Sequence, residues 1–283
     1  MQCMCYALFV FSMLVFLWII TPLFVGGALV YCLLSHNSVA LLFVALSLLW
    51  STYMIAHPCC VRTSLPRTLL SHPSWYLWFH AEKPVPNKYA NNVCLFVHPH
   101  GLLSIGSLAL FHFVPNSNTV FAVSTFLFYI PITSIFLPHC GFVPATKYGI
   151  QCAMESDCNL LINPGGLPEI ICAEAQTPLF FIERRFGIFK LAFRHKQTIQ
   201  LIVIENEEKT YNVVPLPCRK YRIYIAWWTN FFLLIIPCFG GIACSHVPHR
   251  VHLKALQCDS IPHEEVQDFL ALKARYTDML PGN

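Results

Sequence analysis

The first 61 residues contain no Asp, Glu, Lys or Arg, and this absence constrains the fold more than any other feature. Residues 6–34 form one long apolar run, a polar break follows at 35–38, and a second apolar run covers 39–56. A helix that crosses a bilayer needs about 20 apolar residues. The sequence therefore predicts an N-terminal transmembrane or re-entrant helical hairpin over 1–61. A cleaved signal peptide fits less well, because its apolar core spans only about 7–15 residues after basic residues.

The first charged residues of the chain indicate how this hairpin is oriented. Arg62, Arg67, Lys83 and Lys88 follow it, with Glu82 as the one acid among them. Basic residues collect on the cytoplasmic side of membrane segments. We therefore expect both ends of the hairpin, and the domain predicted over 62–283, to face the cytoplasm.

The overall composition agrees with membrane contact. The chain is 56% hydrophobic and 11% charged, whereas soluble domains average about 25% charged residues. Two later segments, 121–138 and 223–244, are apolar enough to be either core or membrane-facing. The few basic residues are scattered, which excludes a nucleic-acid-binding class. The cysteines include no Cys-x2-Cys pair, so no metal site is predicted.

Short, continuous apolar runs beyond residue 90 alternate with helix-length stretches. Continuous runs are typical of strands that are buried on both faces, as in parallel sheets. We therefore predict an α/β fold in which helices flank a largely parallel sheet, and a closing helix over 263–280. The predicted strands cover 93–97, 119–123, 159–163, 178–182 and 198–204.

Two histidines follow the first of these strands, in the sequence His98-Pro99-His100-Gly101. The carboxyl ends of strands are where open α/β sheets bind ligands. The residues after Gly101 begin a predicted helix, whose N-terminus favours negative charge. A histidine with a near-neutral pKa at this place is a suitable general base. The alternative is a pair of structural, hydrogen-bonded histidines in a turn.

A second candidate site is the glycine turn of "LLINPGGLPEI" (160–170). Gly165 and Gly166 can present backbone N–H groups to an oxyanion or a phosphate, and Gly101 can do the same in its own turn. Glu169 follows at the same predicted sheet edge. No acid lies between Glu82 and Glu155, so a carboxylate partner for His98 or His100 must come from further along the chain, and Glu169 is the natural candidate.

A third candidate site is the basic segment 183–196, which includes Arg184, Arg185 and Lys190 among aromatic residues. Such a cluster can bind phosphates or a membrane surface. The alternative is a solvated helix face with salt bridges.

These motifs, in this order, resemble the type-2 diacylglycerol and monoacylglycerol acyltransferase family. The chain has that family's "HPHG", its GG-x-x-E segment as "GGLPE", and a segment "RFGIFKLAF" (185–193) similar to its "RKGFVKLAL". The resemblance covers about 70–280. Two departures stand out, because "ENEE" (205–208) replaces the family's "FGE", and Phe186 replaces a basic residue.

The resemblance implies a glycerolipid-acyltransferase-like fold and an acyl-CoA-dependent O-acyltransferase of the endoplasmic reticulum membrane. His100, or alternatively His98, would act as base with Glu169, and Arg184, Arg185 and Lys190 would bind acyl-CoA. Acyl-CoA is then a co-substrate, and neither a cofactor nor a metal is required. Diacylglycerol is the favoured acceptor. Monoacylglycerol, fatty alcohols, sterols, lysophospholipids, a homo-oligomeric state and a catalytically degenerate lipid-binding protein stay open as alternatives.

Overall fold

The structure is a computed structural model of the 283-residue chain. It describes two isolated residues, Gly27 and Tyr31, and a set of longer ranges. These ranges are 38–56, 92–101, 104–113, 118–129, 131–156, 158–172, 181–182, 184–209, 217–229 and 254–280.

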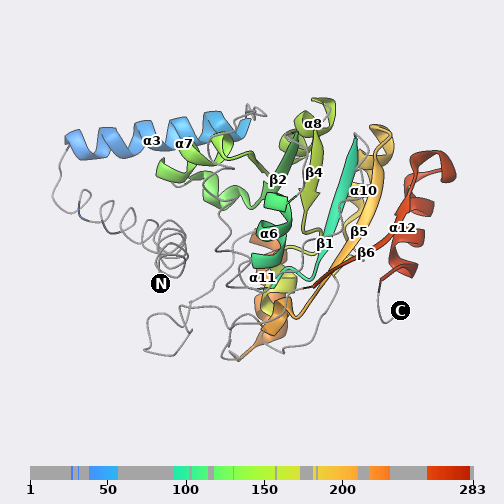
Figure 1. The fold of residues 1–283 in the computed structure, drawn as a ribbon. Coiled ribbons are helices and arrows are strands. Elements are labelled where there is room, and N and C mark those ends of the chain that lie inside the picture. The colour runs from blue at the N-terminus through green and yellow to red at the C-terminus, as the bar shows by residue number, and fades with distance from the viewer. Residues whose placement is uncertain are drawn as a thin grey trace, which may run out of the picture.

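Within these ranges the elements alternate between strands and helices (Figure 1). The strands are β1 (Val93–His98), β2 (Thr119–Val123), β3 (Phe142–Pro144), β4 (Asn159–Ile162), β5 (Thr198–Glu205) and β6 (Lys254–Ile261). The α-helices are α3 (Ser38–Ala56), α6 (Ile105–Phe113), α7 (Pro131–His139), α8 (Lys147–Glu155), α9 (Leu167–Cys172), α10 (Phe186–Arg194), α11 (Arg219–Thr229) and α12 (Phe269–Asp278). Short 3-10 helices form η2 (Thr125–Tyr129), η4 (Glu207–Lys209) and η6 (His263–Glu265).

The six strands form one mostly parallel sheet in the order β3-β2-β4-β1-β5-β6. Strands β1 to β5 are parallel to one another, whereas β6 is antiparallel to β5. Strand β1 lies between β4 and β5, and its residues are buried throughout. All five parallel strands therefore end at the same edge of the sheet, which is the edge where His98 closes β1.

The predicted α/β fold with a largely parallel sheet is confirmed, and four of the five predicted strands correspond to β1, β2, β4 and β5. The prediction of a strand at 178–182 is wrong where it can be checked, since Phe181 and Ile182 lie outside any strand and 178–180 lie outside the described residues. Strands β3 and β6 were not predicted. The segment 121–138, predicted as core or membrane-facing, forms the end of β2, η2 and most of α7.

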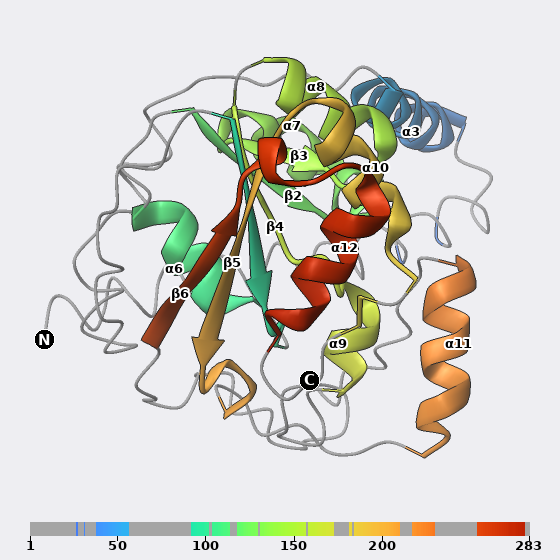
Figure 2. The ribbon, with the colours of Figure 1, turned by 90° about the vertical axis from the view of Figure 1, so that its right-hand side faces the viewer.

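One face of the sheet is covered by α8, α10 and α12 (Figure 2). The strand residues on this face alternate, as in Cys94 and Phe96 of β1, because successive side chains of a strand point to opposite faces. Phe96 packs edge-on against Phe189 of α10 and Tyr276 of α12, with ring centroids 5.5 and 5.2 Å apart. Asp268 caps α12 by accepting a hydrogen bond from the Ala271 N–H at 2.7 Å.

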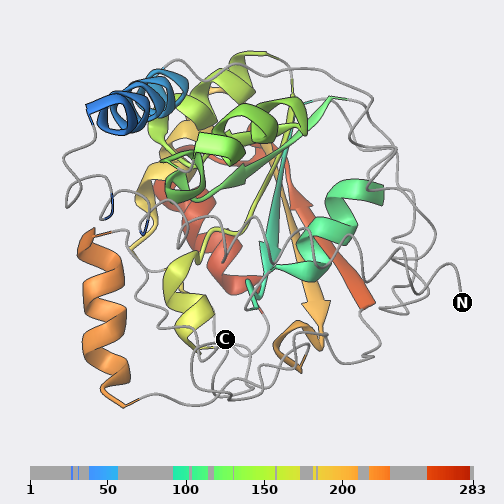
Figure 3. The ribbon, with the colours of Figure 1, turned by 90° about the vertical axis from the view of Figure 1, so that its left-hand side faces the viewer.

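Helix α6 lies on the opposite face of the sheet (Figure 3). Its Phe111 ring packs against Phe121 of β2 and Phe142 of β3, at centroid distances of 5.8 and 5.4 Å. Helix α6 begins near the end of β1, and these aromatic contacts hold its other end against the sheet (Figure 3).

Outside the sheet, α3 packs against η2 and α7, and α11 packs against α9. Helix α3 matches the second predicted apolar run, and Leu42, Leu49 and Tyr53 on it are each more than half exposed. In the part of the chain that the structure describes, no helix has both the length and the apolar character needed to cross a membrane. The predicted spanning hairpin is therefore not supported, and most of its first run, 6–34, lies outside the described residues. Residues 230–244 of the later apolar segment also lie outside them.

Helix α12 provides a matched pair of leucines that tests its packing on the sheet. Leu272 is fully buried, whereas Leu270 is 52% exposed. We expect Leu272→Ala to lower the free energy of unfolding by about 2–5 kcal/mol, because it leaves a cavity in the core. Leu270→Ala should change it by about 0.5 kcal/mol or less. Chemical denaturation of both variants measures the difference, and equal losses would contradict the packing of α12.

Candidate active site

The candidate active site lies at the end of β1, in residues 98–101, which we call the histidine turn. His98 is the last residue of β1 and is fully buried, whereas His100 is partly buried. Gly101 has a φ of +60°, a conformation that residues with a Cβ rarely adopt. Gly101 therefore allows the chain to turn sharply from the strand toward α6, which brings both histidines to the carboxyl edge of the sheet.

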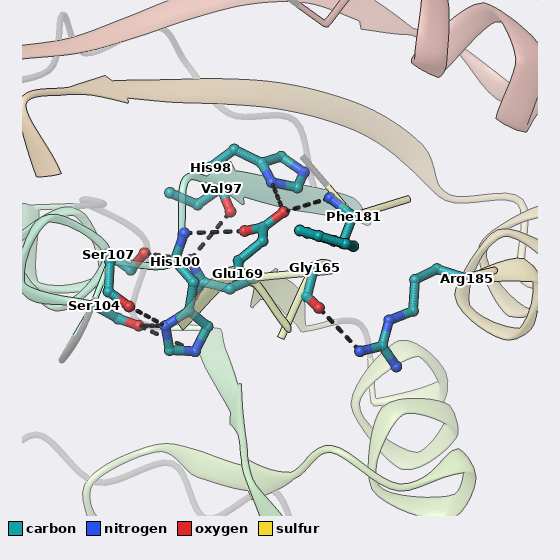
Figure 4. Close-up of polar contacts among 11 residues, drawn as sticks. Val97, His98, His100, Ser104, Ser107, Gly165, Glu169, Phe181 and Arg185 are labelled. Carbon is teal, nitrogen blue, oxygen red and sulfur yellow. Dashed lines mark hydrogen bonds and ion pairs between the residues drawn. The ribbon is translucent and has the colours of Figure 1, made fainter. Parts of the chain in front are cut away.

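A buried pair between His98 and Glu169 forms the centre of this site (Figure 4). The Nδ1 of His98 lies 2.9 Å from Oε1 of Glu169, and both side chains are fully buried. The second oxygen, Oε2, accepts the backbone N–H of His100 at 3.0 Å, and Oε1 also accepts the Phe181 N–H at 3.1 Å. One carboxylate therefore binds the first histidine through its ring and the second through its backbone.

Glu169 reaches the histidines because α9 begins directly after β4, the strand beside β1. Its carboxyl folds back over Gly165, where an added Cβ would lie 1.8 Å from Oε1. Gly166, with a φ of +61°, donates its N–H to the Asn163 carbonyl at 3.2 Å and so closes the turn. The two glycines thus serve the placement of Glu169 in this structure, and the Gly166 N–H is engaged within the turn.

Glu169 was predicted to reach the sheet edge beside His100, with His98 as the alternative partner, and in the structure its carboxylate pairs with the His98 ring. The His100 ring instead contacts Ser104, whose Oγ lies 2.8 Å from Nδ1 and 3.3 Å from Nε2. The Gly101 carbonyl lies 3.1 Å from the same Nδ1. Because a carbonyl oxygen can only accept, this geometry favours a proton on Nδ1 and leaves the lone pair on Nε2.

The surroundings of His100 and Glu169 determine the charge of each group at pH 7. Burial lowers the pKa of His100, although Glu169 opposes the shift, so the ring is neutral at pH 7. Burial by itself would raise the pKa of Glu169. The contacts with His98, the Phe181 N–H and His100 outweigh burial, so the pKa lies below its usual value. The site therefore combines an ionised carboxylate with a neutral imidazole.

Asn163 is a site residue that the sequence interpretation missed. It is buried at the end of β4, and its Nδ2 donates to the Val97 carbonyl at 3.1 Å and to Ser107 Oγ at 2.8 Å. These bonds join β4, β1 and α6 at one point. The polar residue at the end of an apolar run was the available signal, because a buried amide must find hydrogen-bond partners.

The three basic residues predicted to bind acyl-CoA lie in different environments. Arg185 is half-buried, and its Nη2 donates to the Gly165 carbonyl at 2.9 Å, so it belongs to the turn that carries Glu169 (Figure 4). Arg184 and Lys190 are exposed. The structure thus brings Arg185 to the site and leaves the other two at the surface near α10.

Glu207 is the second residue that the sequence interpretation missed, since "ENEE" was read only as a departure from a family motif. Its side chain is 2% exposed, and its Oε2 accepts the Gly106 N–H at 2.8 Å. The signal was a carboxylate just after a buried strand, but its use required the knowledge that β5 lies beside β1.

Comparison with known proteins gives a distant relationship. A curated relative from Mus musculus, Diacylglycerol O-acyltransferase 2-like protein 6, is 24% identical over 158 residues. The alignment covers 49% of this chain and 47% of the relative, so the chain matches about half the length of that relative. No family model and no solved structure matches the chain. The alignment supports a distant relationship to this diacylglycerol O-acyltransferase 2-like protein.

Proposed function

We propose that the protein is an acyl-CoA-dependent O-acyltransferase that esterifies the hydroxyl of a neutral lipid, with diacylglycerol as the favoured acceptor. The observation that carries the proposal is the Glu169 carboxylate, which binds the His98 ring and the His100 backbone at the carboxyl edge of the sheet. The distant relationship to a diacylglycerol acyltransferase 2-like protein supports the same reaction class.

In the proposed reaction His100 is the general base. Its Nε2 takes the proton of the acceptor hydroxyl while the hydroxyl oxygen attacks the thioester carbon, which forms the new C–O bond. The resulting oxyanion would be stabilised by backbone N–H groups near Gly101 and Gly165. When the oxyanion collapses, the C–S bond breaks, and the CoA thiolate takes the proton from the imidazolium. General-base catalysis of this kind contributes roughly 10²–10⁴-fold.

His100 is preferred to His98 as the base because of access and orientation. His98 is fully buried, and its Nδ1 is bound to Glu169. His100 is partly buried, and the Gly101 carbonyl beside its Nδ1 leaves the lone pair on Nε2, which also lies 3.3 Å from Ser104 Oγ. In this assignment His98 and Glu169 are positioning residues that hold the turn, and His100 meets the substrate.

The basic residues around α10 are proposed to bind the phosphates of CoA. Arg184 and Lys190 are exposed, and Arg185 is tied to the carbonyl of Gly165, within the same turn as Glu169. Guanidinium groups suit this task, because they bind phosphate oxygens with two parallel hydrogen bonds. Phosphates held here would lie near the turn that carries Glu169.

A catalytically degenerate lipid-binding protein was suggested by the missing "FGE" motif. The contact between Glu207 of the "ENEE" segment and α6 weakens this alternative, because the segment supplies a buried carboxyl to the histidine turn. Monoacylglycerol, a fatty alcohol, a sterol or a lysophospholipid as acceptor is compatible with the same chemistry. Membranes that contain the protein, labelled oleoyl-CoA and a panel of these acceptors test the proposal, and no labelled ester with any acceptor would refute it.

We expect His100→Ala to abolish acyl transfer, because the variant lacks the group that takes the hydroxyl proton. The protein level should stay unchanged, since His100 is partly exposed. His139→Ala is the matched control. His139 is exposed at the end of α7 and lies before β3, on the side of the sheet where the parallel strands begin. Ester formation measured for both variants decides the role of His100, and activity like the wild type in His100→Ala would exclude it as the base.

Glu169→Gln should lower kcat by about 10²-fold or more while the KM for acyl-CoA changes little. A carboxylate accepts hydrogen bonds at both oxygens, whereas an amide accepts at one and donates at the other. The variant would therefore set an N–H against either the His98 ring, the Phe181 N–H or the His100 N–H. Glu264→Gln, an exposed change, is the control. A loss confined to the KM of the acceptor would move Glu169 from catalysis to acceptor binding.

We further propose that residues 1–61 attach the protein to the endoplasmic reticulum membrane with both ends of the segment in the cytoplasm. The support is the absence of charged residues in this segment and the basic residues that follow it. Tags at residues 1 and 283 should both be digested by a protease added to sealed microsomes, while a lumenal marker protein stays intact. Protection of either tag would contradict this orientation, and failure to sediment with the microsomes would contradict the attachment.

A further inference from the structure

Both strands that flank β1 are followed by a buried glutamate that contacts the histidine turn. Strand β4, on one side, leads to Glu169, which binds His98 and the backbone of His100. Strand β5, on the other side, leads to Glu207, which is 2% exposed and lies in η4. The proposed mechanism uses the first carboxyl and leaves the second without a role.

The side chain of Glu207 lies close to two glycines, Gly101 and Gly106. An added Cβ at Gly101 would lie 2.6 Å from both Cγ and Oε1 of Glu207. An added Cβ at Gly106 would lie 2.6 Å from Oε2, which accepts the Gly106 N–H at 2.8 Å. A carboxyl group can occupy this space only because neither position has a side chain. Gly101 is also bonded directly to His100, so Glu207 acts one residue away from the proposed base.

The protonation of Glu207 differs from that of Glu169. Burial raises the pKa of Glu207 to about 8, the N–H groups of Gly106 and Ile105 oppose the shift, and Glu208 adds to it. Other titratable groups in these elements include His98 and His100 in the turn and Glu205 at the end of β5, which is exposed. The described side chains of α6 carry no charge. At pH 7 the carboxyl of Glu207 is therefore mostly neutral, whereas that of Glu169 is ionised.

We propose that Glu207 is a positioning residue of the acyl-transfer site, which holds Gly101 and the first turn of α6 and so fixes the place of the His100 ring. Its catalytic consequence rests on the proposed function. Ser104, which contacts the His100 ring, precedes this first turn of α6, and any shift of the helix start moves the contact. Glu207 thus acts on the base through the backbone and touches no substrate.

The test compares Glu207→Ala, Glu207→Gln and the control Glu205→Ala. Glu205 is exposed two residues earlier in the same segment. We expect Glu207→Ala to lower kcat by about 10²-fold with little change in the KM for acyl-CoA, because a small misplacement of a reacting group has that effect. Glu207→Gln should restore kcat to within about threefold at pH 7, because a neutral amide replaces a neutral carboxyl. Glu205→Ala should match the wild type.

Amide hydrogen exchange of peptides that cover 98–110 provides a readout independent of activity. Exchange should be faster in Glu207→Ala than in the wild type and unchanged in Glu207→Gln and Glu205→Ala. If the wild type transfers no acyl group, the proposed function fails, and the exchange data alone then decide whether Glu207 holds the turn. Unchanged exchange in Glu207→Ala, or a kcat equal to that of Glu205→Ala, would overturn the inference.

The pH dependence keeps the inference testable if Glu207→Ala does not fold. Because the folded carboxyl keeps its proton up to about pH 8, whereas its ordinary pKa is 4.5, the wild type loses stability as the pH rises between these values. Glu207→Gln has no such proton to lose. The difference in melting temperature, variant minus wild type, should therefore increase from pH 5 to pH 8.5. A difference that does not change with pH would contradict the buried, neutral carboxyl.

Discussion

The buried pair of His98 and Glu169 is the interaction on which the rest of the site depends. Two ionisable side chains with no solvent exposure lie 2.9 Å apart at the carboxyl edge of the sheet. Loss of one partner from such a pair leaves a buried charge uncompensated and costs about 3–5 kcal/mol. The pair is tolerated because the Glu169 carboxylate also accepts the N–H groups of His100 and Phe181. The proposed catalytic geometry and the local stability therefore depend on the same carboxylate.

Three ionisable groups around one turn are held in different protonation states by their surroundings. Hydrogen bonds and the neighbouring histidines lower the pKa of Glu169 against the effect of its burial, whereas burial lowers the pKa of His100 and raises that of Glu207 to about 8. Groups whose pKa values are driven apart within one site are typical of acid–base catalysis.

The sequence predicted the strands that are buried on both faces, because continuous apolar runs are their direct signature. It did not predict β3, which has three residues, or β6, an antiparallel edge strand whose sequence mixes polar and apolar residues. It correctly brought Glu169 to the sheet edge. It could not tell which histidine ring binds the carboxylate, since that depends on the backbone path through Gly101. Glu207 was missed because the pairing of β5 with β1 is not encoded in any local motif.

The distribution of charge along the chain explains why the site must be assembled from distant segments. The first 146 residues contain five charged residues, all within 62–88, so the histidine turn has no acid nearby in sequence. Its carboxyl groups arrive from 71 residues away, for Glu169 and His98, and from 101 residues away, for Glu207 and Gly106. Both arrive only when β4 and β5 pair with β1 in the correct register, because a slip by one residue reverses the faces of a strand. The half of the chain that contains the histidines has no acid near them in sequence. The parallel topology brings carboxyl groups to the histidines from the other half.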